Sequence, residues 1–592
     1  MIVTMNKVTL LVSAQDREQA LETLQDLGVM HLSFAAFPED GQVESARERL
    51  DTIRQLREMI PEDAPGEQDR QKSPPSFDVE SLWQLVQQAR RFRREIEDLD
   101  KEIERIRPFG RFDPEAVRGL ETSGVRVRLY ETSVHSEPAV PEGVYRVETY
   151  RDKETVCFVL IGLDEPNIEI PEVPLPRASL ESLRREKKQL EDQEADLRRQ
   201  FAGYAVFRSN LDAELEKARD WYDFVTARAG LVEHGPVLAL EGFVPGKRLY
   251  RLQQSVVEQG WGVVVREVRP EDQPPTLLEH PAWVRPIKAV FEMIGVVPGY
   301  FETDISLPFL LFLSLFFAMI VGDAGYGALF IGGTLLAGRF FRVPDHAFRL
   351  MLVMSGCTVV WGLLNGNLFG LQALPAVLEP LQLDWLSGPG SEKHLMLLCF
   401  IIGAIQLTLA HTWRLVLLLP QVRALAQLGW ILVTWTMFFL ARRLVLLEEF
   451  PGVMLYCLAG GLILIVVFML PLSSIGRNWP EYVRLPLDLI SSFVDLVSYI
   501  RLYAVGMATF AIASAFNGMA ATIGLDGVFS GLAAAGIIFL GHGLNILLAG
   551  MGVLVHGVRL NTLEFAGHTG IQWTGTLFSP FARRHTTKGD EA

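Results

Sequence analysis

One long apolar stretch of the chain carries a permanently charged side chain far from either of its ends. Residues 485–516 read LPLDLISSFVDLVSYIRLYAVGMATFAIASAF, and Arg501 lies about 25 Å along a helix axis from Arg484. A charge at such a depth in a membrane costs about 2.5 to 3.5 kcal/mol. The alternative is that Arg501 snorkels to the headgroups, but both ends are distant. The pattern therefore favours a functional guanidinium on an ion pathway.

Two stripes of polar residues accompany this arginine. Asp488, Ser491 and Asp495 share a helical face that runs toward Arg501, and hydration of a helix end is the alternative interpretation. Residues 541–565, GHGLNILLAGMGVLVHGVRLNTLEF, align a second set at three- and four-residue spacing: His542, Asn545, His556 and Arg559. A single histidine in such a helix usually serves packing, whereas several ionisable residues on one face favour ion transfer.

Other candidate sites carry weaker signals. The GDAGYG turn at 322–327 places Asp323 between two apolar stretches, and Gln406 and His411 are as consistent with structural roles as with functional ones. The four cysteines lie far apart without the spacing of a metal site, so we expect neither a metal nor a cofactor. GFVPGKR at 242–248 does not match a phosphate-binding loop, which excludes ATP cleavage of that kind.

The elements that must position these residues are apolar helices. Eight stretches from Ser306 onward predict an all-α domain of eight transmembrane helices over 301–592, the last two long and tilted: 306–322, 325–341, 348–373, 394–419, 424–447, 452–472, 485–521 and 528–565. The arginines between them fit the positive-inside rule if both termini are cytoplasmic. Arg442 and Arg443 are the exception.

The first 300 residues have a different composition. They hold 40 Lys and Arg against 54 Asp and Glu, whereas residues 301–592 hold 15 against 16. The acidic balance argues against a nucleic-acid partner. Patterns near 7–34 and 237–268 predict β-α-β units, and heptads run from Leu85 to Ile106 and from Leu183 through Tyr204 to Leu211. We therefore expect an α+β cytoplasmic half over 1–300, in which two α/β lobes are joined by an antiparallel coiled coil.

The motifs together resemble a known family. SYIRLYAVGMA, GDAGYG, VHGVRLNTLEF and the terminal FSPF, behind a coiled-coil half, look like the a subunit (subunit I) of the archaeal and bacterial V/A-type rotary ATPases. The resemblance implies a membrane stator with ion half-channels against a rotating proteolipid ring. Arg501 then corresponds to the family's essential arginine and Arg559 to its second one, with Glu564 of the same motif in the ion path.

The resemblance also implies partners and a location. The partners would be the proteolipid (c/K) ring, peripheral stalk E/G-type subunits, a central-stalk d/C-type subunit, membrane lipids and, indirectly, the catalytic V1/A1 headpiece. The location would be the inner membrane. The sequence departs from the family after Phe565, where AGHTGIQWTG replaces the usual lysine and aromatic pair, and at Ala549, where eukaryotic relatives carry a glutamate.

Two other functions remain possible on the sequence. A secondary ion transporter with a cytoplasmic coiled coil would use the arginine as a counter-ion, but it predicts inverted repeats that the apolar half lacks. A membrane tether would leave Arg501 and both polar stripes unexplained. The sequence favours neither proton nor sodium, and neither ATP synthesis nor hydrolysis.

Overall fold

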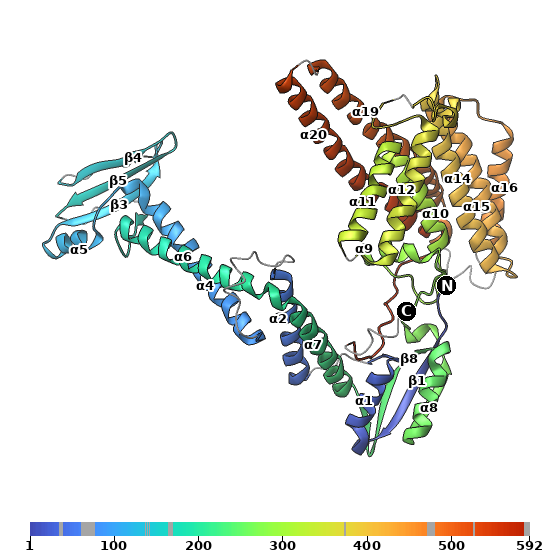
Figure 1. Ribbon diagram of the computed structural model, residues 1–592, viewed down its shortest axis with the longest axis horizontal. Coiled ribbons are helices and arrows are strands. Elements are labelled where there is room, and N and C mark those ends of the chain that lie inside the picture. The colour runs from blue at the N-terminus through green and yellow to red at the C-terminus, as the bar shows by residue number, and fades with distance from the viewer. Residues whose placement is uncertain are drawn as a thin grey trace. The chain divides into compact units, whose positions relative to one another are not determined.

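The computed structural model describes residues 1–34, 40–60, 77–136, 138, 140, 143–163, 168, 170–341, 343–371, 375–469, 480–524 and 527–584 (Figure 1). The Pro-rich stretch at 61–76, Arg342 and Arg477 lie outside the described residues. The chain divides into two compact units, of which one contains 1–9, 242–258 and 263–580, and the other contains 10–241, 259–262 and the residues from 581. A membrane boundary at residue 300 stays a prediction.

A five-stranded sheet combines segments from both ends of the first 270 residues. Its strands have the order β2-β8-β1-β9, with β7 paired to β8. β1 buries Val8, Leu10 and Val12 because alternate side chains of a strand point to the same face. The two β-α-β patterns of the sequence therefore belong to one sheet, formed with its helices by β1 (Met5–Ser13), α1 (Arg17–Leu27), β2 (His31–Leu32), β7 (Val232–His234), β8 (Val237–Pro245), α8 (Leu249–Gln259) and β9 (Gly262–Glu267).

A second sheet is antiparallel and has the strand order β4-β5-β3-β6. Tyr130, Phe158 and Leu160 form its core, whereas the edge strand β4 is largely exposed. Burial raises the pKa of the Cys157 thiol to about 11, which makes it an inert core residue. The elements are α5 (Pro114–Thr122), β3 (Arg126–Ser133), β4 (Tyr145–Arg151), β5 (Thr155–Gly162) and β6 (Glu172–Val173).

Four helices connect these sheets in sequence: α2 (Gly41–Met59), α4 (Val79–Ile106), α6 (Leu180–Gly203) and α7 (Arg208–Ala229). The end of α4, at Leu99 and Ile103, packs against the start of α6, at Leu183, so the two helices are antiparallel (Figure 1). The second heptad series does not continue along one helix. A 3₁₀ turn at Tyr204–Phe207 interrupts it, and α7 packs on α2 instead. Coiled-coil supercoiling stays a prediction.

Each of the eight apolar stretches is largely helical, and the seventh, 485–521, contains parts of two helices, α18 and α19. With the short α9 and α13, the helices are α9 (Lys288–Ile294), α10 (Ser306–Val321), α11 (Ala324–Phe340), α12 (Asp345–Asn365), α13 (Asp384–Ser387), α14 (Ser391–Leu418), α15 (Ala424–Ala441), α16 (Val453–Phe468), α18 (Pro480–Val497), α19 (Ile500–Ile523), α20 (Val528–Gly552) and α21 (Ala566–Thr569). Segments of π-helix occupy Arg442–Leu446, Val553–Gly557 and Leu560–Phe565. Short 3₁₀ turns occur at Ala14–Asp16, Arg107–Phe109, Tyr204–Phe207, Gly246–Arg248, Pro270–Asp272, Arg285–Ile287 and Glu379–Leu381.

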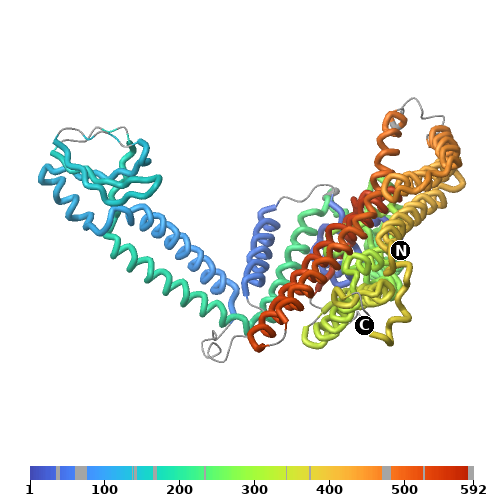
Figure 2. The backbone as a smooth tube through the Cα atoms, turned by 90° about the horizontal axis from the view of Figure 1, so that it is seen from above, coloured from blue at the N-terminus to red at the C-terminus, as the bar shows by residue number. Residues whose placement is uncertain are grey.

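Five helical segments are long and apolar enough to cross a membrane. A sixth results if α10 and α11, which are bent by 119° at their junction, count as one span. Eight crossings therefore stay a prediction. Tyr482–Ile523 and Val528–Thr569 each contain 42 residues, about 63 Å of helix against a hydrocarbon core of about 30 Å. Their helices α19 and α20 run side by side (Figures 1 and 2).

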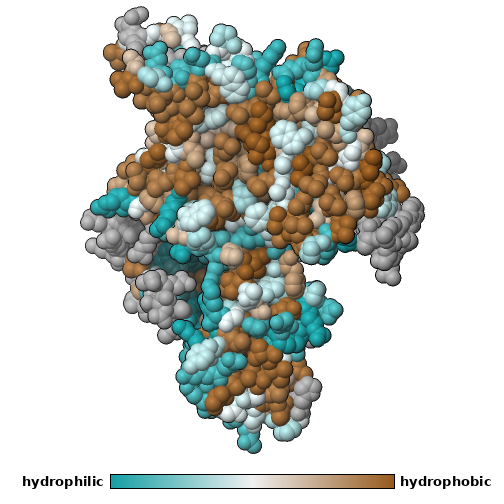
Figure 3. Space-filling model, turned by 90° about the vertical axis from the view of Figure 1, so that its right-hand side faces the viewer, coloured by the Kyte–Doolittle hydropathy of each residue, from teal (hydrophilic) through white to brown (hydrophobic). Residues whose placement is uncertain are grey.

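Burial and charge in this region suit a membrane environment. α10 is apolar on every side and almost wholly buried, as expected of a central helix. The face shown in Figure 3 carries a broad hydrophobic band over the apolar helices, with hydrophilic side chains above and below it. Arg442, an exception to the charge rule, pairs with Glu448 and lies over the rings of Phe438 and Phe439. Its charge is therefore compensated locally.

Candidate functional site

Arg501 lies at the start of α19, just after the break at residues 498 and 499 that separates α18 from α19. Its Nη2 donates to Oε1 of Glu564 at 2.6 Å, and its Nε donates to the carbonyl oxygen of Ser498 at 2.9 Å. Nε of Arg559 lies 3.6 Å from the same Glu564 oxygen. The structure thus brings together three of the residues named from sequence, in a group that we call the arginine cluster.

Local helix geometry explains this arrangement. Residues Leu560–Phe565 are π-helical, and a π-helical turn bonds residues five apart, so Arg559 and Glu564 share a face. The Glu564 side chain is only 4% exposed, and burying it is tolerable because two guanidinium groups face it. Its Oε2 has no hydrogen-bond partner among the described residues. The cluster therefore holds one net positive charge and an unused acceptor.

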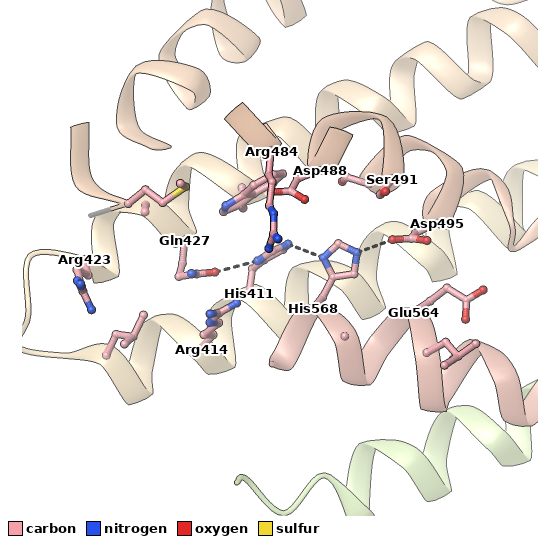
Figure 4. A pocket seen from close by; sticks show the side chains of 17 residues that line it. His411, Arg414, Arg423, Gln427, Arg484, Asp488, Ser491, Asp495, Glu564 and His568 are labelled. Atoms are coloured by element: carbon pink, nitrogen blue, oxygen red, sulfur yellow. Dashed lines mark hydrogen bonds and ion pairs between the residues drawn. The ribbon is translucent and has the colours of Figure 1, made fainter. Parts of the chain in front are cut away.

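A pocket of about 650 Å³, here called the wide pocket, lies beside this cluster (Figure 4). Glu564 lines it, as do Asp488, Ser491 and Asp495 of α18. Asp488 is exposed and Asp495 is half-buried. The polar stripe of Asp488, Ser491 and Asp495 therefore becomes more buried toward Arg501, as its helical spacing predicted. The remaining polar lining comes mainly from the end of α14, the start of α15 and α21.

A chain of four side chains crosses the wide pocket (Figure 4). Asp495 Oδ2 lies 3.1 Å from Nε2 of His568, whose Nδ1 lies 3.1 Å from Nε2 of His411. Nδ1 of His411 lies 2.9 Å from Oε1 of Gln427. The sequence gave His411 only a weak signal and His568 none, although His568 lies in the segment that departs from the family pattern.

A second, smaller pocket lies at the other end of α14. This narrow pocket measures about 110 Å³, and Ser391, Glu392 and Cys399 line it, whereas the wide pocket meets α14 at 411–418. The same division holds on the long α18–α19 segment, where residues 484–495 line the wide pocket and residues 502–510 the narrow one. Arg501 lies between the two sets of lining residues.

The residues between the pockets form a buried hydrogen-bonded layer. Tyr499 donates its hydroxyl to Oε1 of Gln406 at 2.8 Å, and Gln406 donates Nε2 to Oδ1 of Asn561 at 3.0 Å. All three side chains are fully buried. Because their polar groups bond one another, the layer offers no group that must be hydrated. It separates the two pockets on both α14 and α18–α19.

The second polar stripe divides into two places. His542 and Asn545 meet at the hydroxyl of Tyr326, at 2.6 Å from His542 Nδ1 and 3.0 Å from Asn545 Nδ2. Nε2 of His542 also bonds Oδ1 of Asn517, at 3.0 Å. His556 lies in the π-helical segment Val553–Gly557 instead, where its Nδ1 is buried with no hydrogen-bond partner in the described part of the chain.

Asp323 takes a structural position. It is the N-cap residue of α11, and its carboxylate accepts backbone hydrogen bonds from four residues: Gly325, Tyr326, Phe369 and Gly370. Capping of this kind satisfies amides that a helix end leaves free. These contacts fix the turn between α10 and α11 against the segment that follows α12, and the ion-pathway role of Asp323 stays a prediction.

The described residues contain no group of three or more His, Cys, Asp or Glu side chains placed to hold a metal ion. The arrangement is therefore built from hydrogen-bonding and proton-exchanging groups: carboxylates, imidazoles, hydroxyls and guanidinium groups. Such a set can bind a proton, move it between neighbours and lower the pKa of a carboxylate that approaches the arginine cluster.

Comparison with known proteins identifies relatives along the whole chain. It is 31% identical to V-type ATP synthase subunit I 1 of Treponema pallidum, over 99% of this chain and 100% of the relative. It is 29% identical to V-type ATP synthase subunit I of Borreliella burgdorferi, over 98% and 100%, and 25% identical to A-type ATP synthase subunit I of Methanocaldococcus jannaschii, over 59% and 56%.

No family model matches the chain. A solved structure of the cytoplasmic N-terminal domain of subunit I, homolog of subunit a, of V-ATPase matches 44% of this chain and 100% of that one at 13% identity. Its TM-score is 0.19.

Proposed function

The chain belongs to the V-type and A-type ATP synthase subunit I family, and from this membership we propose that it conducts ions past a rotating ring of membrane carboxylates. As a family member it is a membrane subunit of a rotary ATPase. The proposal concerns what this subunit does within the complex. We assign the wide pocket to a cytoplasmic half-channel, the narrow pocket to an outer one, and Arg501 to the boundary between them.

The observation that carries the proposal is the layer between the pockets. Tyr499, Gln406 and Asn561 close the direct route, because their buried polar groups bond one another. An ion that enters one pocket must therefore leave the stator before it can reach the other. A rotating ring supplies that detour, since each of its carboxylates can take an ion at one pocket and release it at the other after nearly a full turn.

Arg501 fits the task of forcing release. A guanidinium lowers the pKa of a carboxylate that comes near it, and it stays protonated at any physiological pH. Glu564 and the carbonyl of Ser498 hold two of its nitrogens, which orients the group. Nη1 makes no hydrogen bond to a described residue and is the nitrogen that we assign to the ring. Arg559 is the second cation of this boundary.

The remaining named residues divide between the two half-channels. Asp488, Ser491 and Asp495 line the cytoplasmic path. We also assign His542 and Asn545, joined through Tyr326, to the outer path, together with Asp323; none of them is among the residues that line the narrow pocket, which reaches the same turn through Gly322 and Asn367. We place His556 beside Arg501 and Arg559, because the charges of both arginines act on its imidazole ring.

The partners follow from the same role. We assign the face of α19 and α20 to the proteolipid ring, and the two sheets with their connecting helices to the peripheral E/G-type stalks and the central-stalk d/C-type subunit. The V1/A1 headpiece is then an indirect partner. This arrangement places both termini on the cytoplasmic side of the inner membrane.

Replacing Arg501 tests the function. Arg501→Ala in the complete complex, reconstituted into vesicles, is expected to abolish ATP-driven ion transport, and Arg501→Lys to abolish most of it, because lysine lacks the planar fork and can lose its proton in an apolar site. Arg443→Ala is the matched control, since this arginine lines neither pocket. Full transport by an assembled Arg501→Ala complex would refute the proposal.

A further inference from the structure

The hydrogen-bonded chain in the wide pocket has a direction that can be derived from its chemistry. Gln427 Oε1 only accepts hydrogen bonds, so Nδ1 of His411 carries the hydrogen between them. A neutral His411 then has a lone pair on Nε2 and accepts from Nδ1–H of His568. This fixes the tautomer of His568 and leaves its Nε2 lone pair toward Asp495.

The contact between Asp495 and His568 must then hold one proton. At 3.1 Å, Asp495 Oδ2 and His568 Nε2 share either a protonated carboxyl and a neutral imidazole or a carboxylate and an imidazolium. A proton can pass between these two atoms without any movement of the backbone. His568 is 14% exposed and lines the pocket, so its ring also reaches the space where water enters.

The same surroundings are unfavourable for a metal cation. Hard cations such as Na⁺ take oxygen ligands, whereas this chain offers imidazole nitrogens at its centre. Asp495 Oδ2 is bonded to His568, and the Glu564 carboxylate, whose Oε2 is unbonded among the described residues, faces the guanidinium groups of Arg501 and Arg559 through Oε1. Three further arginines, Arg414, Arg423 and Arg484, line the pocket together with the carboxylates of Asp488, Asp495 and Glu564. Guanidinium groups repel a metal cation and cannot ligate it.

We propose that the ion carried through the wide pocket is a proton and that it passes from Asp495 to His568. The inference rests on the half-channel function proposed above and names its ion. Asp495 in its acid form gives its proton to Nε2 of His568, which leaves an Asp495 carboxylate and a His568 imidazolium. The imidazolium then releases one proton to water in the pocket, which leaves the pair with one negative charge, and the pair returns to its starting state when the Asp495 carboxylate takes up the next proton. Flow in the other direction reverses these steps.

Transport by the complete complex in vesicles tests the ion. ATP-driven acidification, measured with a pH-sensitive dye in a sodium-free potassium medium, is expected to be full, and uptake of radioactive Na⁺ in a sodium medium is expected to be absent. His568→Gln keeps a hydrogen-bonding side chain but cannot accept and release a proton at Nε2. We expect it to slow acidification about tenfold or more.

Controls separate the relay from a packing effect. His346→Gln removes a histidine that bonds Glu292 and lines neither pocket, and it is expected to keep the wild-type rate. If His568→Gln fails to assemble, Gln427→Met removes the acceptor that fixes the tautomers without altering either histidine, and it is expected to slow acidification. The ratio of rates in H₂O and D₂O should rise in the slowed variants, because proton transfer becomes limiting.

The possible outcomes test the ion, the relay and the half-channel function separately. Sodium uptake that depends on Arg501 would overturn the proton assignment and leave the half-channel function standing. Acidification that is unchanged in assembled His568→Gln would overturn the relay. If an assembled, ATP-hydrolysing complex moves neither ion, both the inference and the proposed function fail.

Discussion

Two glutamates in different parts of the molecule each face a pair of arginines. Glu194, on α6, lies 3.1 Å from Arg93 and 2.9 Å from Arg198, whose side chains are 58% and 63% exposed. Glu564, in the π-helical segment that follows the apolar helix α20, lies 2.6 Å from Arg501, which is 24% exposed, and 3.6 Å from Arg559. The contacts are similar in geometry, but the two groups differ in burial: Glu564 is 4% exposed and Glu194 13%, and Arg501 is less exposed than either arginine of Glu194, whereas Arg559, at 54%, is nearly as exposed as they are. The same combination of one glutamate and two arginines is thus a surface ion-pair group on α6 and part of the candidate functional site beside α20.

The comparison explains why charge is informative in only one half of the sequence. Exposed ion pairs contribute about 0 to 1 kcal/mol, so the many Lys, Arg, Asp and Glu residues of α2, α4, α6 and α7 are weakly constrained in position. A charge among apolar helices costs several kcal/mol unless it is paired. Each one that is present there therefore needs a partner or a function, and six of them line the wide pocket: Arg414, Arg423, Arg484, Asp488, Asp495 and Glu564.

The largest expected effect that tests this comparison is that of Glu564→Gln. The change leaves Arg501 and Arg559 without their shared carboxylate, and removing one partner of a buried pair costs about 3 kcal/mol, the lower end of the usual range because both arginines keep some access to water. Thermal unfolding of the purified complex should shift to lower temperature, and transport should fall. An unchanged midpoint would mean that Glu564 is as well hydrated as Glu194.

The second effect concerns depth within the wide pocket. Asp495→Asn removes the carboxylate that bonds His568, and transport is expected to slow by about tenfold or more, because an amide cannot relay a proton. Asp488→Asn is the matched control at the mouth, where the carboxylate is exposed and bonds no described residue, so that water can replace it. Equal and mild effects of the two changes on the initial acidification rate would mean that the stripe of Asp488, Ser491 and Asp495 is only a hydrated helix end.

These residues also mark the limit of what the sequence predicts. Local periodicity was enough to place Asp488, Ser491 and Asp495 on one face, and to locate the β-α-β units and the apolar helices. It could not pair Arg501 with Glu564, which are 63 residues apart and meet through a π-helical turn that has no sequence signature. His568 was missed for a related reason, since it follows the apolar stretch and gains its role only from His411 and Asp495.

The fold shows the same limit. The heptads located two antiparallel helices, because the first series lies within α4 and the second begins within α6. The series beyond Tyr204 suggested a continuing arm, but a 3₁₀ turn redirects α7 onto α2. Asp323 lies in a motif that resembles a functional one, yet four backbone amides occupy its carboxylate. Hydrogen bonds between distant segments decide such cases.

A third prediction concerns the water-exposed region, where apolar side chains are informative instead. The edge strand β4 exposes Tyr145, Val147 and Tyr150 on a sheet that we assign to a stalk subunit. Replacing Tyr145 and Val147 by serine should lower the amount of stalk subunits that copurify with the complex, because contiguous exposed apolar groups mark binding surfaces. Val206→Ser, at an exposed position between α6 and α7, is the control. If the β4 variant retains all of its stalk subunits, the stalk contact does not lie on β4.

The smallest expected effect is that of Glu194→Gln. Two arginines at hydrogen-bonding distance suggest a strong site, but both guanidinium groups are more than half exposed, so water already solvates them and replaces the lost carboxylate. The local free energy of opening in α4 and α6 should fall by less than about 1 kcal/mol. Amide hydrogen exchange of the full-length protein measures this, and the difference from wild type should vanish in about 1 M salt, where the Debye length is about 3 Å. A loss as large as that of Glu564→Gln, or one that persists in salt, would mean that contact geometry alone sets the strength of these clusters and that burial is not what distinguishes the arginine cluster.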